Sequence, residues 1–266
     1  MSSTGSSGRL LPALEIQSRV IGALILRELH TRFGRDNIGY LWFIVEPMLL
    51  AIGITSVHLA IHASLPQGYR IAPFYLSGYV SYMVFRSIVN RATGIVISNK
   101  GLMYHQQVTL LDIILARSLL ELAACICALT ILVGLAITVG LAELPPRPML
   151  VVIGMVTMTW FSTGLGMLIC AGGEYSPVVE RLVHPATYLA LPISGMFFMT
   201  EWLAPPLRAM MRWVPLPQII DIVRVGLFAQ ATGEDINPGY LLLWCAGTTI
   251  LGLFALKLAR RRMHFE

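Results

Sequence analysis

Tyr75, Tyr79 and Tyr82 precede Arg86 at spacings of four, three and four residues, which places the four side chains on one stripe of a helix. Phe85 lies beside this stripe. Aromatic faces suit the C–H surfaces of pyranose rings, and phenols hydrogen-bond to sugar hydroxyls, so Tyr79 and Tyr82 could line a passage for a carbohydrate chain. The alternative is an aromatic belt at a membrane interface together with ordinary packing, and the belt is favoured for Tyr75.

Glu46 and Arg86 are ionisable residues within apolar runs, where a charge is costly unless it has a partner or a function. At 1.5 Å per residue, Glu46 lies roughly 10 Å into the first run. Arg86 lies about 8 Å from the same edge of a core about 30 Å thick. The matching depths predict an ion pair between them. The alternative is that each side chain extends to its own interface.

The residues provide no arrangement for catalysis. Carboxylates are scattered, and no Ser/His/Asp or Cys/His set stands out, so the chain is not expected to be an enzyme. The cysteines lie in apolar runs and predict neither a disulfide framework nor a metal site. Lys100 and Lys257 are the only lysines, and neither follows the glycine pattern of a P-loop. Any dependence on ATP must therefore come from a partner.

The composition requires a membrane. The chain has 266 residues, of which 56% are hydrophobic and 12% charged, whereas about a quarter of the residues of a soluble domain are charged. Runs long enough to cross a bilayer predict an all-α membrane protein with six transmembrane helices. These spans are 39–63, 71–91, 113–141, 149–171, 182–199 and 240–258.

Lys and Arg concentrate on one side of these spans, in the N-terminal segment, the loop after the second span and the C-terminal tail. The positive-inside rule then predicts a multi-pass protein with both termini in the cytoplasm. Six helices are few for a complete pathway, and no internal repeat is visible. A homodimer would supply twelve helices, with a conduit on or beside its two-fold axis.

Two segments outside the spans have apolar faces. After a flexible tail over 1–12, residues 13–33 predict an amphipathic helix lying along the membrane, with Glu28 and Arg32 intruding on its apolar arc. A solvated helix is the alternative. Residues 201–237 predict a pair of short re-entrant helices, because prolines divide an apolar stretch too short to span. The alternative there is an amphipathic segment lying on the surface. Together 13–266 form one domain.

The run from Leu26 to Leu50 carries a specific pattern, Arg32-Phe33 followed by Gly39, Trp42 and Pro47. This pattern resembles the start of the ABC-2 class of ABC-transporter permeases, and within it the capsule polysaccharide export permeases of Gram-negative bacteria. The similarity extends over nearly the whole chain. It includes SNKGLMY at 98–104, DIILARSLLE at 112–121 and VPLPQIIDIVR at 214–224.

The resemblance implies a permease dimer in the bacterial inner membrane, bound to two ABC ATPase subunits that hold ATP and Mg²⁺. Such a complex exports lipid-linked polysaccharide to the periplasm, with a periplasmic co-polymerase and outer-membrane export proteins as further partners and no nucleic acid. The ATPase contacts map onto the interfacial helix and a coupling helix, namely Glu28, His30, Asn99, Gly101, Leu102, Met103, Tyr104 and His105.

The conduit is expected along the first, second and fifth spans. Its predicted lining is Tyr40, Trp42, Phe43, Tyr75, Tyr79, Tyr82 and Phe85. Arg32, Arg35 and Arg91 are expected to attract the phosphate of a lipid linker or an acidic glycan. The positive-inside rule alone also explains arginines at these positions.

Two other classes of function stand beside this one. An ABC-2 permease for another cargo, such as O-antigen, teichoic acid or a small drug, shares the same pattern, although the short outer loops favour a long glycan. A membrane-embedded sugar transferase would need clustered acidic or histidine residues at one membrane face, and the sequence has none.

Overall fold

The computed structural model describes residues 7–33, 38–61, 64–103 and 108–263, with side chains except at 7–14, 16, 31–33, 38–44, 47, 67, 100–103 and 261–263. All regular structure within these residues is helical, in agreement with the predicted fold class. The helices are α1 Ser7–Phe33, α2 Ile38–Ala60, α3 Ile71–Ala92, α4 Ile95–Met103, α5 Leu110–Thr138, α6 Pro148–Tyr175, α7 Pro177–Ile193, α8 Pro205–Met211, α9 Pro215–Leu227 and α10 Pro238–Met263. Two short 3-10 turns, η1 Pro66–Gly68 and η2 Thr200–Trp202, complete the order.

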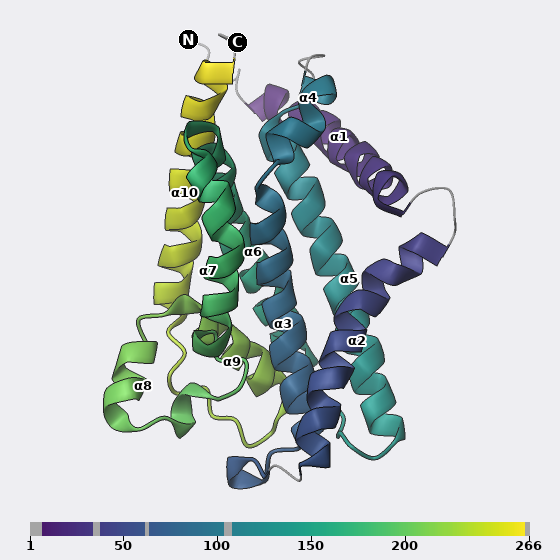
Figure 1. Ribbon diagram of the computed structural model, residues 1–266, viewed down its shortest axis with the longest axis vertical. Coiled ribbons are helices and arrows are strands. Elements are labelled where there is room, and N and C mark those ends of the chain that lie inside the picture. Colours follow the sequence, from purple (N-terminus) through teal and green to yellow (C-terminus); the bar gives the residue numbers. More distant parts are fainter. Residues whose placement is uncertain (1–6, 34–37, 62–63, 104–107, 264–266) are drawn as a thin grey trace.

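The long helices run along the molecule, and both chain ends lie at one end of it (Figure 1). We call this the termini end. Helices α1 and α4 lie there, and α1 crosses the bundle at an angle beside α5. Helices α8 and α9 lie toward the opposite end.

Local sequence explains where several helices begin. Proline loses nothing at the first position of a helix, because that N–H has no partner and the ring already fixes a helical φ. Helix α5 begins with a capping box, in which Thr109 Oγ1 accepts from Asp112 N and the Asp112 carboxylate accepts from Thr109 N. The helices that open with proline are α6, α7, α8, α9 and α10.

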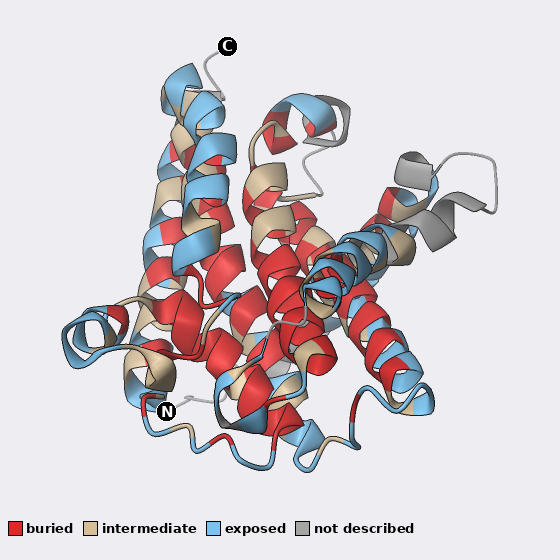
Figure 2. Cartoon of the chain, turned by 60° about the horizontal axis from the view of Figure 1, so that its bottom comes forward, coloured by how far each residue is buried: buried red, intermediate tan, exposed pale blue. Residues whose placement is uncertain are grey.

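Helix α3 forms the centre of the bundle. It packs against α2, α5, α6, α7 and α9, and most of its residues are buried. Buried residues gather along the middle of the molecule, whereas its outer faces are exposed (Figure 2). Helices α6 and α10 pack closely where Gly252 faces Gly164. A Cβ on Gly252 would lie only 2.9 Å from the Gly164 carbonyl oxygen, so this approach requires a glycine.

Three helices in the described part of the chain are long and apolar enough to cross a membrane: α5, α6 and α10. Their outer faces carry exposed large apolar side chains, such as Ile131, Val156 and Phe254, as lipid-facing surfaces require. Among the described residues of α2, the apolar stretch is Met48–Ala60, which is shorter than a membrane span requires. The structure thus agrees with a membrane protein. It identifies three of the six predicted spans by length and composition among the described residues.

Some boundaries differ from those predicted. Helix α1 begins at Ser7, so part of the expected tail over 1–12 is helical. The fifth predicted span, 182–199, is replaced by α7, which begins at Pro177 because Ser176 accepts a hydrogen bond from Val178 N. It ends at Ile193, before Gly195 with φ of 83°. The pair of short helices expected within 201–237 is present as α8 and α9.

Arg224 of α9 organises the end opposite the termini. Its side chain is 0% exposed, and its guanidinium lies over the Phe74 ring of α3, with Cζ 3.8 Å from the centroid. It donates hydrogen bonds to three carbonyl oxygens, those of Gly195 (2.7 Å), Met196 (2.6 Å) and Phe198 (2.5 Å). One side chain therefore holds the segment after α7 against both α3 and α9.

Asp221 supplies the compensating charge, with Oδ1 3.6 Å from the Arg224 guanidinium. Its other oxygen, Oδ2, accepts from the backbone N (3.2 Å) and the hydroxyl (2.7 Å) of Thr200 in η2. A buried arginine is tolerated only when paired and hydrogen-bonded, and this one is both.

We predict that Arg224→Met destabilises the protein by about 3–5 kcal/mol, because it leaves three buried carbonyls without this donor and the buried Asp221 carboxylate uncompensated. Thermal or denaturant unfolding of the purified protein in detergent measures the loss.

The matched control is Arg70→Met. Arg70 also binds a carbonyl oxygen and a carboxylate, those of Gly140 and Glu143, but its side chain is 44% exposed. Its loss is expected to cost at most about 1 kcal/mol. Equal losses for the two variants would contradict the role assigned to Arg224.

Candidate functional site

A set of charged and polar side chains joins four helices at the termini end. Arg117 Nε of α5 lies 3.0 Å from Glu28 Oε1 of α1, and Arg91 Nη1 of α3 lies 3.3 Å from Glu121 Oε1 of α5. Asn99 of α4 accepts a hydrogen bond from Arg27 of α1 at 3.2 Å. We call Glu28, Arg91, Asn99, Arg117 and Glu121 the helix-junction network.

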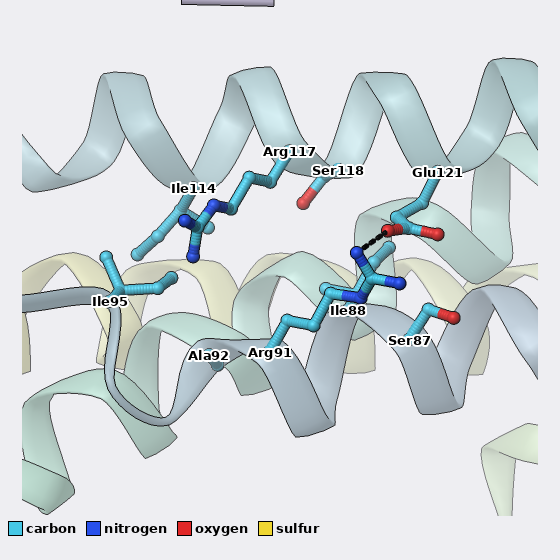
Figure 3. Close-up of a pocket in the computed structure, with 9 residues that line it drawn as sticks. All are labelled: Ser87, Ile88, Arg91, Ala92, Ile95, Ile114, Arg117, Ser118 and Glu121. Carbon is cyan, nitrogen blue, oxygen red and sulfur yellow. Dashed lines mark ion pairs between the residues drawn. The ribbon is translucent and has the colours of Figure 1, made fainter. Parts of the chain in front are cut away.

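Figure 3 shows the part of this network between α3 and α5. Arg91 and Arg117 reach into the space between the helices from opposite sides, and Arg91 meets Glu121. The cavity that they line has a volume of about 10 Å³. That is room for about one water molecule, so the network binds helices to each other rather than a substrate.

These ion pairs are largely buried, so each charge depends on its partner. The side chain of Glu121 is 4% exposed, and those of Glu28 and Arg117 are 11% and 17% exposed. Removing one partner of a buried pair leaves a charge without compensation, so the pairs favour one arrangement of α1, α3 and α5. A second contact, from Gln17 of α1 to Asp112 of α5 (3.2 Å), fixes the same junction.

Three of the predicted site residues lie in this network. Glu28 and Asn99, predicted to contact an ATPase, are 9% and 3% exposed and bind other helices of the same chain. Arg91, predicted to attract substrate, pairs with Glu121 and has a side chain that is 36% exposed. The intrusion of Glu28 on the apolar arc of its helix was the sequence signal of an inward charge, because the apolar arc is the face that packs.

Other residues point outward from the same helices. Ile97, 67% exposed, and Ser98 lie on the outer side of α4. His30 is exposed on α1, where its Nδ1 contacts the Leu26 carbonyl oxygen at 2.8 Å. Nothing in the sequence distinguished Ile97, since an isolated apolar residue in a short helix has no characteristic pattern.

Several predicted site residues lie wholly or partly outside the described residues. Tyr104, His105 and Arg35 lie outside the described residues. The backbone of the others belongs to α1, α2 or α4, but their side chains are outside the description. These are Arg32, Tyr40, Trp42, Phe43, Gly101, Leu102 and Met103.

The aromatic stripe of α3 is buried within the chain. Tyr75, Tyr79, Tyr82 and Phe85 are between 0% and 6% exposed. Tyr82 donates a hydrogen bond to the Thr187 carbonyl oxygen of α7, and the Tyr75 ring lies 3.9 Å from the His58 ring of α2. In the single chain these aromatic residues therefore pack in the core instead of facing an open passage, because α2, α5, α6, α7 and α9 pack around α3.

Arg86 has a different partner from the one predicted. It donates a hydrogen bond to Tyr188 Oη of α7, and its Cζ lies 4.3 Å from the centroid of that ring. No ion pair joins Glu46 to Arg86 among the residues that the structure describes. Tyr188, which the sequence analysis did not select, is 58% exposed.

No group of three or more His, Cys, Asp or Glu side chains in the described part of the chain could hold a metal ion. The four cysteines are free thiols. The described residues thus provide interhelical ion pairs at the termini end of the bundle. They also provide an exposed contact between Arg86 of α3 and Tyr188 of α7.

Comparison with known proteins places this bundle in a family. The family model described as ABC-2 type transporter matches residues 19–228. The capsule polysaccharide export inner-membrane protein CtrC of Neisseria meningitidis serogroup B is 33% identical, covering 91% of each chain. The corresponding protein BexB of Haemophilus influenzae is 31% identical over 92% of each chain.

The polysialic acid transport protein KpsM of Escherichia coli is 26% identical, over 90% of this chain and 93% of its own. The family match runs from α1 through α9, and therefore includes both the helix-junction network and the Arg224 contacts. The family model and these relatives each match most of the chain, and the described fold is a helical bundle with apolar helices of membrane length. The chain therefore belongs to the ABC-2 type transporter family.

Proposed function

We propose that this chain is the permease subunit of an ATP-driven exporter that moves lipid-linked capsular polysaccharide from the cytoplasm to the periplasm. The observation that carries the proposal is similarity over nine-tenths of the chain to proteins named for capsule polysaccharide export. Their names also support a location in the bacterial inner membrane. The chain has no P-loop, so a separate ABC ATPase would bind ATP and Mg²⁺.

The proposed topology has six crossings, by α2, α3, α5, α6, α7 and α10, with both termini in the cytoplasm. Helix α3 has 22 residues, a length of about 33 Å. It contains Arg86 and Arg91, which lower its hydropathy, but these residues do not need to meet lipid because neighbouring helices cover α3. Helix α9, with 13 residues, would re-enter the membrane beneath the outer surface, covered by α3 and α6.

At the cytoplasmic end, the outer side of α4 would seat on the ATPase through Ile97 and Ser98. Asn99 on the inner side binds Arg27 of α1, and α1 binds α5 through Glu28 and Arg117. A displacement of α4 by the ATPase would thus reach the helices of the bundle through short polar contacts.

We predict that Glu28→Gln uncouples ATP hydrolysis from export, because it removes one charge of the pair that ties α1 to α5. The reconstituted complex should still hydrolyse ATP, while glycan export falls several-fold. The matched control, Glu15→Gln, breaks the exposed pair with Arg19 on the same helix and should leave both activities unchanged.

A double-mutant cycle between Glu28 and Arg117 gives the strength of the contact directly. Unfolding measurements should yield an interaction energy of about 0.5–3 kcal/mol, as is typical of residues in direct contact. Export that is retained in Glu28→Gln would refute the proposed transmission.

The conduit would lie against the face where α3 meets α7, closed by a second copy of the chain. Arg86 and Tyr188 form an exposed contact there, and an arginine at membrane depth needs protein or water around it rather than lipid. The guanidinium would attract acidic groups of the glycan while the tyrosine ring contacts its sugar faces. Arg32, Arg35, Tyr40, Trp42 and Phe43 remain predictions for the cytoplasmic mouth and the first span.

We predict that Tyr188→Ala and Arg86→Leu each reduce export several-fold, because they remove the exposed aromatic ring of this face and its half-buried cationic partner. The control is Phe254→Ala on α10, an aromatic side chain that is also exposed, at 62% against 58% for Tyr188. Surface glycan is measured at equal permease level. A comparable loss in the control would show that exposed aromatic area in general, and not this face, is required.

The function itself is tested by deletion and by purification of the tagged protein in mild detergent. Deletion should leave the polysaccharide inside the cell. Mass spectrometry should find an ATPase in near equal amount, with a co-polymerase and outer-membrane export proteins at lower levels. Normal surface polysaccharide in the deletion strain, or the absence of any ATPase, would overturn the proposal.

A further inference from the structure

A groove of about 590 Å³ is formed where α8 ends, α9 begins and the loop before α10 returns to the bundle. Helices α8 and α9 lie toward the end opposite the termini (Figure 1). The functional groups of the groove come from Arg212, Trp213, Gln218, Glu234, Asn237 and Tyr240. None of them takes part in the helix-junction network or in the arginine–tyrosine face. The volume falls within the range of small-molecule binding sites.

Ion pairs and hydrogen bonds hold the floor of this groove in place. The Asp235 side chain, 5% exposed, accepts hydrogen bonds from Arg208 of α8 (2.8 Å) and from Arg212, the residue after α8 (2.7 Å). The hydrogen bond from Arg208 to Asp235 raises the pKa of the Arg208 guanidinium. Buried Gln218 joins the two walls, donating to the Arg212 carbonyl oxygen (2.7 Å) and accepting from Asn237 N (3.0 Å). Tethering of each wall means that a ligand need not order the site when it binds.

The rim presents a large aromatic surface. The Trp213 residue is 73% exposed. Its backbone is held in place by Tyr240, whose Oη donates a hydrogen bond to the Trp213 carbonyl oxygen at 2.7 Å. The Trp213 and Tyr240 rings meet edge to face, with centroids 6.1 Å apart. An exposed aromatic ring at a polar groove offers a stacking surface for the apolar face of a sugar.

The polar groups beside this ring have unused hydrogen-bonding capacity. The side chains of Arg212 and Glu234 are 53% and 72% exposed. A guanidinium has five N–H donors and a carboxylate about four acceptor sites, so both can bind a ligand while keeping their present contacts. Adjacent donors and acceptors of this kind match neighbouring hydroxyls on one sugar ring.

The charge balance favours a sugar over a phospholipid headgroup. The charged residues that line the groove are Arg212, Glu234 and Asp235, and Arg208 pairs with the two carboxylates from outside the lining. The groove therefore has no net positive charge to attract a phosphate. A hydroxyl-rich ligand, in contrast, uses charges of both signs as hydrogen-bond partners.

We propose that this groove is a carbohydrate-binding site that holds a short stretch of the glycan after it leaves the conduit, with Trp213 as the stacking platform and Arg212 and Glu234 as hydrogen-bonding partners. The inference rests on the proposed function, since it takes the exported polysaccharide as the ligand. A bound stretch at the exit would oppose return of the chain toward the cytoplasm.

Photo-crosslinking in cells that make and export their own polysaccharide tests the site. The photoreactive p-benzoylphenylalanine replaces Trp213 in the full-length chain, and in a second strain it replaces Leu207, which is exposed on α8 but does not line the groove. After irradiation the permease is purified and digested, and the adducts are identified by mass spectrometry. We expect sugar adducts at position 213 that disappear when polysaccharide synthesis is deleted, and several-fold fewer at position 207.

The other outcomes overturn the proposal. A phospholipid adduct at position 213 would assign the groove to the membrane, and an adduct with another protein would assign it to a protein interface. Absence of a sugar adduct would also reject it. If deletion of the permease leaves surface polysaccharide normal, the proposed function fails; if export requires the permease but position 213 gives no sugar adduct, only the groove assignment fails.

Two variants measure what the site contributes. Trp213→Ala should lower surface polysaccharide several-fold at equal permease level, whereas Trp213→Tyr, which keeps an aromatic ring, should restore most of it. Equal loss in both variants would show that Trp213 acts through packing rather than through an aromatic surface.

Discussion

Charged groups withdrawn from water must be paired, and this constraint determines both ends of the molecule. At the end opposite the termini, fully buried Arg224 binds three carbonyl oxygens and lies near Asp221. At the termini end, Glu28 pairs with Arg117, and Arg91 pairs with Glu121. The apolar middle of the bundle offers large contact areas but little directional preference, so these polar contacts select the arrangement of the helices.

The two polar centres are connected through α3. Phe74, near its first turn, lies under the Arg224 guanidinium, and Arg91, in its last turn, pairs with Glu121. Because α3 is covered along nearly its whole length, a movement of either end would require the neighbouring helices to move with it. This continuity is the physical basis for linking the proposed ATPase contact at α4 to the opposite end of the bundle at α9.

The burial of α3 also changes how its aromatic stripe is understood. Periodicity identified Tyr75, Tyr79 and Tyr82 as one face of a helix, but a period cannot distinguish a face that meets a passage from one that meets other helices. Helices α2 and α7 cover this face, and the exposed aromatic residue near Arg86 is Tyr188 of α7. Even a correct helix assignment thus left the role of these side chains undecided.

The sequence by itself determined the membrane class, the apolar runs of α5, α6 and α10, the prolines that begin five helices, and the pattern at Arg32 to Pro47 that indicates the family. These features are local or compositional, so they need no knowledge of neighbours in space. Tertiary structure alone decided the partners of Glu28, Arg86 and Arg224 and the formation of the groove beside Trp213. Each of these depends on residues far apart in the chain, which only the packing of the helices brings within hydrogen-bonding distance.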